Sequence, residues 1–115
     1  MFEYKVNLIK VIDGDTVDFE VDLGFGMKFG ERFRLYGINT PEIRTRFKEE
    51  KAKGYAAKKY LRDKLKNNSE SLIIKTYKDK KDKYGRYLCE IFYGKKQTNL
   101  NLELVRMGHA VYVKY

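Results

Sequence analysis

Three short groups of residues carry the chemistry that this sequence could perform. The stretch VIDGDTV, residues 11–17, places Asp13 and Asp15 on either side of a glycine. RLYGINTPE, residues 34–42, begins with an arginine and ends with a glutamate, and DKYGR, residues 82–86, ends with a second arginine. Carboxylates can hold a hard cation, and guanidinium groups can grip a phosphate. Together the three groups indicate a site for phosphodiester hydrolysis.

Each group also has an ordinary structural interpretation. The Asp-Gly-Asp stretch can be a turn in which an aspartate bonds its own backbone. Arg34 and Glu42 can form a surface ion pair, which contributes little to stability. DKYGR can be a plain hairpin turn. The interpretation as a site therefore depends on the three groups meeting in the fold.

The remaining residues exclude several other kinds of active site. His109 is the one histidine and Cys89 the one cysteine, so a Ser-His-Asp triad, a Cys-His pair or a zinc cluster lacks parts. No phosphate-binding GxxxxGK[ST] loop occurs. Oxygen ligands alone favour Ca²⁺ or Mg²⁺ over zinc. We expect Cys89 to be a small buried hydrophobe and His109 to be structural.

Charge is distributed unevenly along the chain. The formal net charge is +9, but residues 1–42 hold five Lys/Arg and eight Asp/Glu, a net of −3. Residues 43–115 hold twenty Lys/Arg and eight Asp/Glu, a net of +12. A strongly basic half favours an anionic partner such as nucleic acid, although lysines can also simply form a solvated surface.

The size and hydropathy of the chain place it among ordinary globular proteins. Its 115 residues fit one domain, which we expect to span residues 1–115. No stretch reaches the roughly 20 apolar residues of a membrane span, so we expect no membrane partner. The N-terminal residues show no secretory signal, which fits either a cytoplasmic protein or a secreted one whose signal has been removed. We expect a monomer.

Alternating and glycine-punctuated segments predict a small, mostly β barrel. The predicted strands cover residues 4–12, 17–23, 32–38, 71–77 and 87–93. We expect a glycine-rich hairpin connection at 24–31, a charged mobile loop at 43–54 and a basic turn at 78–86. Helices are predicted at 54–67 and, with an asparagine at its start and a glycine at its end, at 99–108. Residues 110–115 should be extended.

The motifs VIDGDTV, RLYGINTPE, DKYGRYL and LNLELVRMGHA occur together, in one order. With these motifs the chain resembles the staphylococcal nuclease (thermonuclease) family over nearly its whole length. The resemblance implies an OB-fold, a five-stranded barrel with one inserted helix and one short late helix, in the α+β class. It also implies Ca²⁺-dependent endonucleolytic cleavage of DNA or RNA that leaves 3′-phosphates, with single strands as the expected preference.

The resemblance assigns expected roles to individual residues. Asp15 and the backbone carbonyl of Thr40 match metal ligands, and Glu42 matches the catalytic glutamate near the attacking water. The matches to phosphate-gripping arginines are Arg34 and Arg86, and the matches to substrate-contacting residues are Lys83 and Tyr84.

Asn39 is where this chain departs from the pattern, because well-studied members of the family carry a second aspartate ligand there. An asparagine still offers a neutral carbonyl oxygen to Ca²⁺, so we expect a weakened metal ligand. Two alternatives remain open. The first is a non-catalytic nucleic-acid-binding module, since OB-folds bind single strands through basic grooves and stacking aromatics. The second is a protein-interaction domain with a vestigial site.

Overall fold

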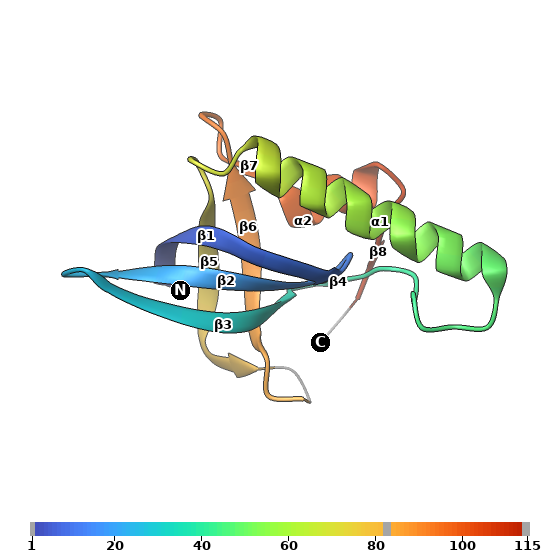
Figure 1. Ribbon diagram of the computed structural model, residues 1–115, viewed down its shortest axis with the longest axis horizontal. Coiled ribbons are helices and arrows are strands. Elements are labelled where there is room, and N and C mark those ends of the chain that lie inside the picture. The colour runs from blue at the N-terminus through green and yellow to red at the C-terminus, as the bar shows by residue number, and fades with distance from the viewer. Residues whose placement is uncertain (1, 82–83, 114–115) are drawn as a thin grey trace.

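A computed structural model of the protein describes residues 2–81 and 84–113, with only the backbone of 78–81. The chain forms a five-stranded mixed β-barrel with two helices in the described part, which confirms the predicted α+β OB-fold class (Figure 1). The barrel strands are β1 (Phe2–Asp13), β2 (Thr16–Gly24), β3 (Met27–Leu35), β5 (Ile73–Lys81) and β6 (Tyr87–Tyr93).

The barrel closes through one parallel pairing. β1 pairs antiparallel with β2 and β5, β2 pairs with β3, and β5 pairs with β6. β3 then runs parallel to β6, with Arg34 opposite Leu88 in the register. Because β6 begins directly after DKYGR, this closure brings the second and third groups of chemistry-bearing residues to one end of the barrel.

Strand alternation builds the core as the sequence predicts. Along β2, Val17, Phe19 and Val21 are buried, while the acidic residues between and after them remain at least partly exposed. The period-two pattern therefore separates an apolar inner face from an acidic outer face. Cys89 is fully buried in β6, as expected, and burial raises the pKa of its thiol well above the ordinary value.

Helix α1 (Lys48–Asn67) begins earlier than the sequence pattern indicated. The expectation of a loop through residue 54 is wrong for residues 48–54, which form the first turns of this helix. Those turns carry no apolar face, but a helix does not need one where it remains in solvent. Glu49 and Glu50 lie in the first turn, where carboxylates favour the positive end of the helix dipole. Farther along, Ala57, Leu61 and Leu65 are fully buried.

The shorter elements also correct some expected boundaries. The predicted connection at 24–31 is a tight turn, because β3 already begins at Met27. The predicted basic turn is shorter than expected as well, since β5 continues to Lys81. The third predicted strand is divided into β3 and the short strand β4 (Ile38–Asn39), which pairs with β8 (Val111–Tyr112).

Helix α2 (Leu100–Arg106) follows the short strand β7 (Thr98–Asn99). As predicted, an asparagine starts the helix: the side chain of Asn99 accepts a hydrogen bond from the backbone N–H of Leu102. Figure 1 shows α1 and α2 on the same side of the barrel.

Glu103 ties the two helices to the barrel. Its carboxylate accepts a hydrogen bond from the hydroxyl of Tyr60 in α1, at 2.6 Å, and another from Tyr93 in β6. Lys64 lies 3.8 Å away. Burial pushes the pKa of Glu103 upward, but the two tyrosine hydrogen bonds and the nearby cations outweigh it and lower the pKa overall. Burial and the hydrogen bond to Glu103 raise the pKa of Tyr93 to about 12.

Two further expectations concern His109 and membranes. The His109 ring packs against the Tyr60 ring with centroids 4.8 Å apart, a contact that fits its expected structural role. Within the described residues, no helix combines the length and the apolar character needed to cross a membrane.

Candidate functional site

Asp15, in the turn between β1 and β2, connects the first two groups of site residues. Its backbone carbonyl accepts a hydrogen bond from Leu35 N–H at 2.8 Å. Its carboxylate accepts one from the Thr40 N–H at 3.1 Å and another from the Thr16 hydroxyl at 3.1 Å. The Asp-Gly-Asp stretch is therefore a turn, as one interpretation proposed, but a turn whose carboxylate is held against the RLYGINTPE segment.

Two glycines allow this close approach of the turn, the loop and helix α1. A Cβ atom on Gly14 would lie 2.8 Å from the Ala57 Cβ and 2.9 Å from the Thr40 Cγ2. A Cβ atom on Gly54 would lie 2.8 Å from the Pro41 carbonyl oxygen. Both distances are too short for non-bonded atoms, so the glycines let α1 support the loop that carries the candidate site.

Arg34 is the buried centre of the cluster, with only 9% of its surface exposed. Its Nη1 donates to the backbone carbonyls of Leu35 at 2.9 Å and Ile38 at 2.8 Å. Its Nη2 donates to the Asn39 side-chain oxygen and lies 3.3 Å from the Asp15 carboxylate. The alternative of an Arg34–Glu42 surface pair is therefore wrong, because Arg34 pairs with Asp15 inside the cluster.

The same arrangement tests whether a metal ion fits. Asp15 and Asn39 direct side-chain oxygens toward one nitrogen of Arg34, so the two oxygens converge on a common point. With the Thr40 carbonyl that the family resemblance assigns, these groups would be hard oxygen ligands with one formal negative charge, the ligand type that Ca²⁺ prefers. Among the described residues, no three His, Cys, Asp or Glu side chains gather in a metal-binding group. The two converging oxygens are already engaged by Arg34 Nη2, so a cation that used both would have to displace this contact.

A pocket of about 390 Å³ adjoins this cluster and holds other predicted residues. It is lined by Ile12, Asp13, Thr16, Arg32, Glu42, Arg44, Tyr84 and Arg86. Arg86 Nη1 lies 3.4 Å from the Thr16 hydroxyl, and its guanidinium is 5.3 Å from the centre of the Tyr84 ring. Glu42 is exposed in this pocket. Lys83 lies outside the described residues.

The predicted site residues thus fall into two neighbouring sets. Asp15, Arg34, Asn39 and Thr40 form the hydrogen-bonded cluster, whereas Glu42, Tyr84 and Arg86 line the pocket. Thr16 joins the two sets, because its hydroxyl donates to Asp15 and lies within hydrogen-bonding distance of Arg86.

Among the polar residues that line the pocket, sequence reasoning did not single out Thr16, Arg32 and Arg44. Arg32 precedes Arg34 by two residues in β3, so the two-residue period of a strand could have placed both arginines on the same face of the sheet. Thr16 directly follows Asp15, but nothing in the sequence indicates that it bridges to a residue seventy positions away.

Comparisons with known proteins identify relatives of this chain. Residues 32–115 match the family described as staphylococcal nuclease homologues. The chain is 37% identical, over 96% of its length, to a protein of Methanocaldococcus jannaschii described as uncharacterized, and covers 60% of that protein. It is 33% identical over 88% of its length to a thermonuclease of Staphylococcus intermedius, covering 56% of it.

A thermonuclease of Staphylococcus hyicus is 30% identical over 96% of the chain, which covers 60% of that enzyme. The chain therefore spans less than two thirds of the length of each of these relatives.

Proposed function

The chain belongs to the staphylococcal nuclease family, and from that premise we propose that it is a Ca²⁺-dependent endonuclease acting on DNA or RNA. The main support is the bridge through Thr16, which joins the Asp15–Arg34 cluster to the pocket that contains Glu42 and Arg86. The residues proposed to hold a cation, to bind phosphate and to position water would thereby be next to one another.

Phosphodiester hydrolysis sets the requirements for such a site. The substrate is anionic, so its charge must be neutralised, a water molecule must be oriented in line, and the pentacovalent transition state must be stabilised. A bound Ca²⁺ supplies Lewis acidity toward a phosphate oxygen. Asp15, Asn39 and the Thr40 carbonyl are the residues that would hold it.

The two arginines have different parts in this proposal. Arg86 reaches the pocket and would donate to the phosphate with its planar fork. Both Nη1 contacts of Arg34 go to backbone carbonyls, so phosphate would compete for Nη2 with Asp15 and Asn39. When those two oxygens turn to a cation, Nη2 becomes available. Cation binding and phosphate binding should therefore support each other.

Glu42 would position the attacking water. A carboxylate is a weak base at neutral pH, so orientation of the water is its main role in this proposal. Attack on phosphorus with departure of the 5′ oxygen leaves a 3′-phosphate and a 5′-hydroxyl. Tyr84, beside Arg86, and Lys83 would contact the substrate.

The experiment is cleavage of single-stranded DNA and of RNA by the pure protein with Ca²⁺, followed by addition of excess chelator. We expect cleavage that stops with the chelator and products that end in 3′-phosphate. Glu42→Gln should lower turnover by about two orders of magnitude, the loss expected when a reactant is misplaced, with a much smaller effect on substrate binding. Full cleavage in the presence of chelator would contradict the metal requirement.

A specific observation also supports a second candidate, a nucleic-acid-binding module without catalysis. Arg34 already uses the side-chain oxygens of Asp15 and Asn39, and only one of these two groups carries a charge. If this internal pairing outcompetes Ca²⁺, the protein would bind single strands without cleaving them. Binding without Ca²⁺-dependent products in the same experiment would favour this candidate, and the absence of both would favour a protein-interaction domain.

A further inference from the structure

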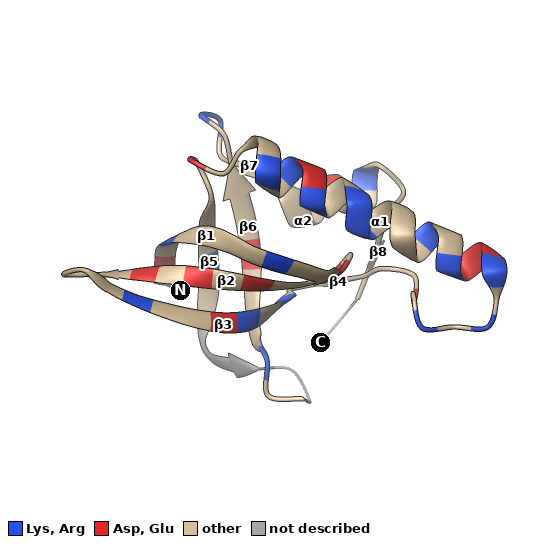
Figure 2. Ribbon diagram, in the orientation of Figure 1, with Lys and Arg blue, Asp and Glu red and all other residues tan. Residues whose placement is uncertain are grey.

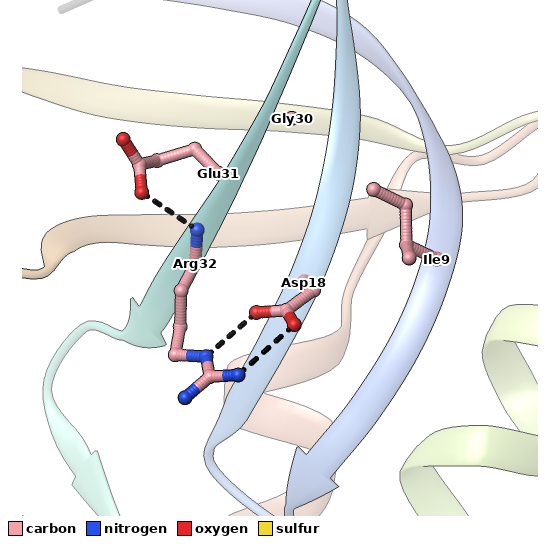
Figure 3. A pocket seen from close by; sticks show the side chains of 5 residues that line it. All are labelled: Ile9, Asp18, Gly30, Glu31 and Arg32. Atoms are coloured by element: carbon pink, nitrogen blue, oxygen red, sulfur yellow. Dashed lines mark hydrogen bonds and ion pairs between the residues drawn. The ribbon is translucent and has the colours of Figure 1, made fainter.

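Arg32 is held in place across two strands beside the candidate site. It lies in β3 directly opposite Asp18 of β2. Its Nε donates to one oxygen of the Asp18 carboxylate at 2.8 Å and its Nη2 to the other at 3.1 Å, so the pair is bidentate (Figure 3). Glu31 bonds only the backbone N–H of Arg32, at 3.0 Å. The side chain is therefore oriented by Asp18 alone among the described residues.

The bidentate pair leaves the other edge of the guanidinium available. Of its five N–H donors, two point to Asp18, and Nη1 has no hydrogen bond to any described residue. Figure 3 shows the remaining nitrogen directed away from the carboxylate. The hydrogen bond to Asp18 raises the pKa of Arg32 further, although partial burial opposes it, so the group stays cationic.

Arg32 lies where its available edge could contact a bound nucleic acid. Arg32 lines the pocket that contains Glu42 and Arg86, and it also lines a neighbouring hollow of about 420 Å³ with Ile9, Asp18, Gly30 and Glu31. It therefore lies on the rim between the two. If the phosphate to be cleaved lies in the pocket, the next phosphate of the same nucleic-acid strand must lie outside the pocket, near some part of this rim.

We propose that Arg32 is a substrate-binding residue that contacts a phosphate adjacent to the one being cleaved, and that Asp18 orients it for this contact. This inference rests on the proposed nuclease function. A guanidinium can bond a carboxylate along one edge and a phosphate along the other, because its donors form a rigid fork. Orientation by Asp18 before binding reduces the entropy lost when the phosphate arrives.

Acidic neighbours limit this contact to a single phosphate. Asp13, Asp18 and Glu31 surround Arg32, and β2 continues outward with Glu20 and Asp22 on its partly exposed face. A backbone that continued over that face would meet mainly carboxylates, and the next cation along β3, Lys28, is paired with Glu20 and lines neither pocket. We therefore expect Arg32 to add one charge contact to binding.

The test compares two alanine variants that change the charge equally. Arg32→Ala removes the proposed contact. Lys28→Ala is the matched control, because Lys28 lies in the same strand, is similarly exposed, pairs with a β2 carboxylate at 3.6 Å, and lines neither pocket. The measurements are KM and kcat for a short single-stranded oligonucleotide and the inhibition constant of a deoxynucleoside 5′-monophosphate, which presents only one phosphate.

We expect Arg32→Ala to raise KM on the order of tenfold, as for loss of one charge-assisted hydrogen bond, with kcat little changed. Inhibition by the monophosphate should stay as in the wild type. The slope of log binding constant against log salt should fall in magnitude by about 0.7, the value for one phosphate of a single strand. Arg32→Lys should keep this slope but recover only part of the affinity, and melting curves would confirm that both variants are folded.

Three outcomes would overturn the proposal. Equal effects of Arg32→Ala and Lys28→Ala would mean that only net charge matters. Equal weakening of oligonucleotide and monophosphate would place Arg32 at the central phosphate. In both cases the wild type still cleaves, and the nuclease function stands. A wild type that neither binds nor cleaves nucleic acid would remove the nuclease function and this inference together.

Discussion

In the proposed site, Asn39 is the residue that would limit how strongly a cation is held. It lies in β4, and its side-chain oxygen accepts a hydrogen bond from the Arg34 nitrogen that also lies near Asp15. An amide oxygen is a competent Ca²⁺ ligand, but it brings no charge. Affinity for Ca²⁺ should therefore depend on Asp15 almost alone, while Arg34 competes for the same oxygens.

Asn39→Asp should tighten Ca²⁺ binding by on the order of tenfold, because affinity follows the charge of the ligands and the two side chains have nearly the same shape. The Ca²⁺ concentration for half-maximal cleavage should fall, whereas the maximal rate should change little. Calorimetry with Ca²⁺, with and without a nucleoside 3′,5′-bisphosphate, measures the change. Unchanged affinity in this variant together with lost affinity in Asp15→Ala would show that residue 39 does not face the metal.

At the scale of elements, helix α1 supports the loop that carries the candidate site residues Thr40 and Glu42. Gly54 of α1 packs directly against the backbone of Pro41, the residue between Thr40 and Glu42. Because glycine has no side chain, the helix and the loop can come into contact here. A glycine inside a helix costs roughly 0.5–1 kcal/mol relative to alanine, so close packing is the physical reason for a glycine here.

Gly54→Ala should therefore destabilise the protein, against the usual gain of helix propensity. The new Cβ would lie 2.8 Å from a backbone oxygen, which cannot move away as a flexible side chain could. Overpacking of this kind costs about 1–3 kcal/mol. Urea unfolding measures the loss, and the displaced loop should also lower any cleavage activity. A gain in stability would mean that the loop yields easily and that α1 does not position it.

Glu103 is the point where both helices and β6 are joined, and its protonation should weaken that junction. Its folded-state pKa is lowered, so its contribution to stability is fully present above the unfolded value of about 4.3 and is lost as pH falls through the folded value. Glu103→Gln should cost about 1.5–3 kcal/mol at pH 7, as for lost hydrogen bonds to a charged group.

The difference between wild type and Glu103→Gln in urea unfolding should be constant from neutral pH down to about 5 and then shrink in more acidic solution. Glu70→Gln is the control, because Glu70 is exposed in the turn after α1. A difference that persists undiminished at the acid end would show that charge does not hold the junction together.

For the whole molecule, charge is separated in space as well as in sequence. Figure 2 shows basic residues distributed along α1 and acidic residues along β2. Nucleic acid should therefore approach from the basic regions and avoid the outer face of β2. The site lies where the two meet, since Asp15 precedes β2 directly and Gly54 of α1 packs on the loop.

Binding of single strands should weaken steeply with salt. Each phosphate neutralised by Lys or Arg contributes about −0.7 to the slope of log binding constant against log salt. Titrations of a fluorescent oligonucleotide at several salt concentrations measure the slope. A flat dependence would mean that the lysines of residues 43–115 do not contact the backbone.

Much of the fold follows from local patterns in the sequence. Alternation in β2 separates buried Val17 and Phe19 from partly exposed Asp18 and Glu20, and β6 matches its predicted bounds of 87–93. The start of α2 at Asn99 could also be predicted from the sequence, because a helix cap is a contact between residues close together in the chain. The first turns of α1 were not, because their charged residues give no periodic signal when the helix surface remains in solvent.

The sequence by itself also determined which chemical groups are present: carboxylates, arginines and an amide where the family pattern has an acid. Only the tertiary structure decided how they are paired. Asp15 bonds Thr40, twenty-five positions away, and Thr16 reaches Arg86, seventy positions away. Those contacts depend on the register of β2 with β3 and on the parallel closure of β3 with β6. Strand register is set by the packing of the whole barrel, so no local pattern could reveal that Arg34 is buried in the cluster whereas Arg32 lies exposed on the rim.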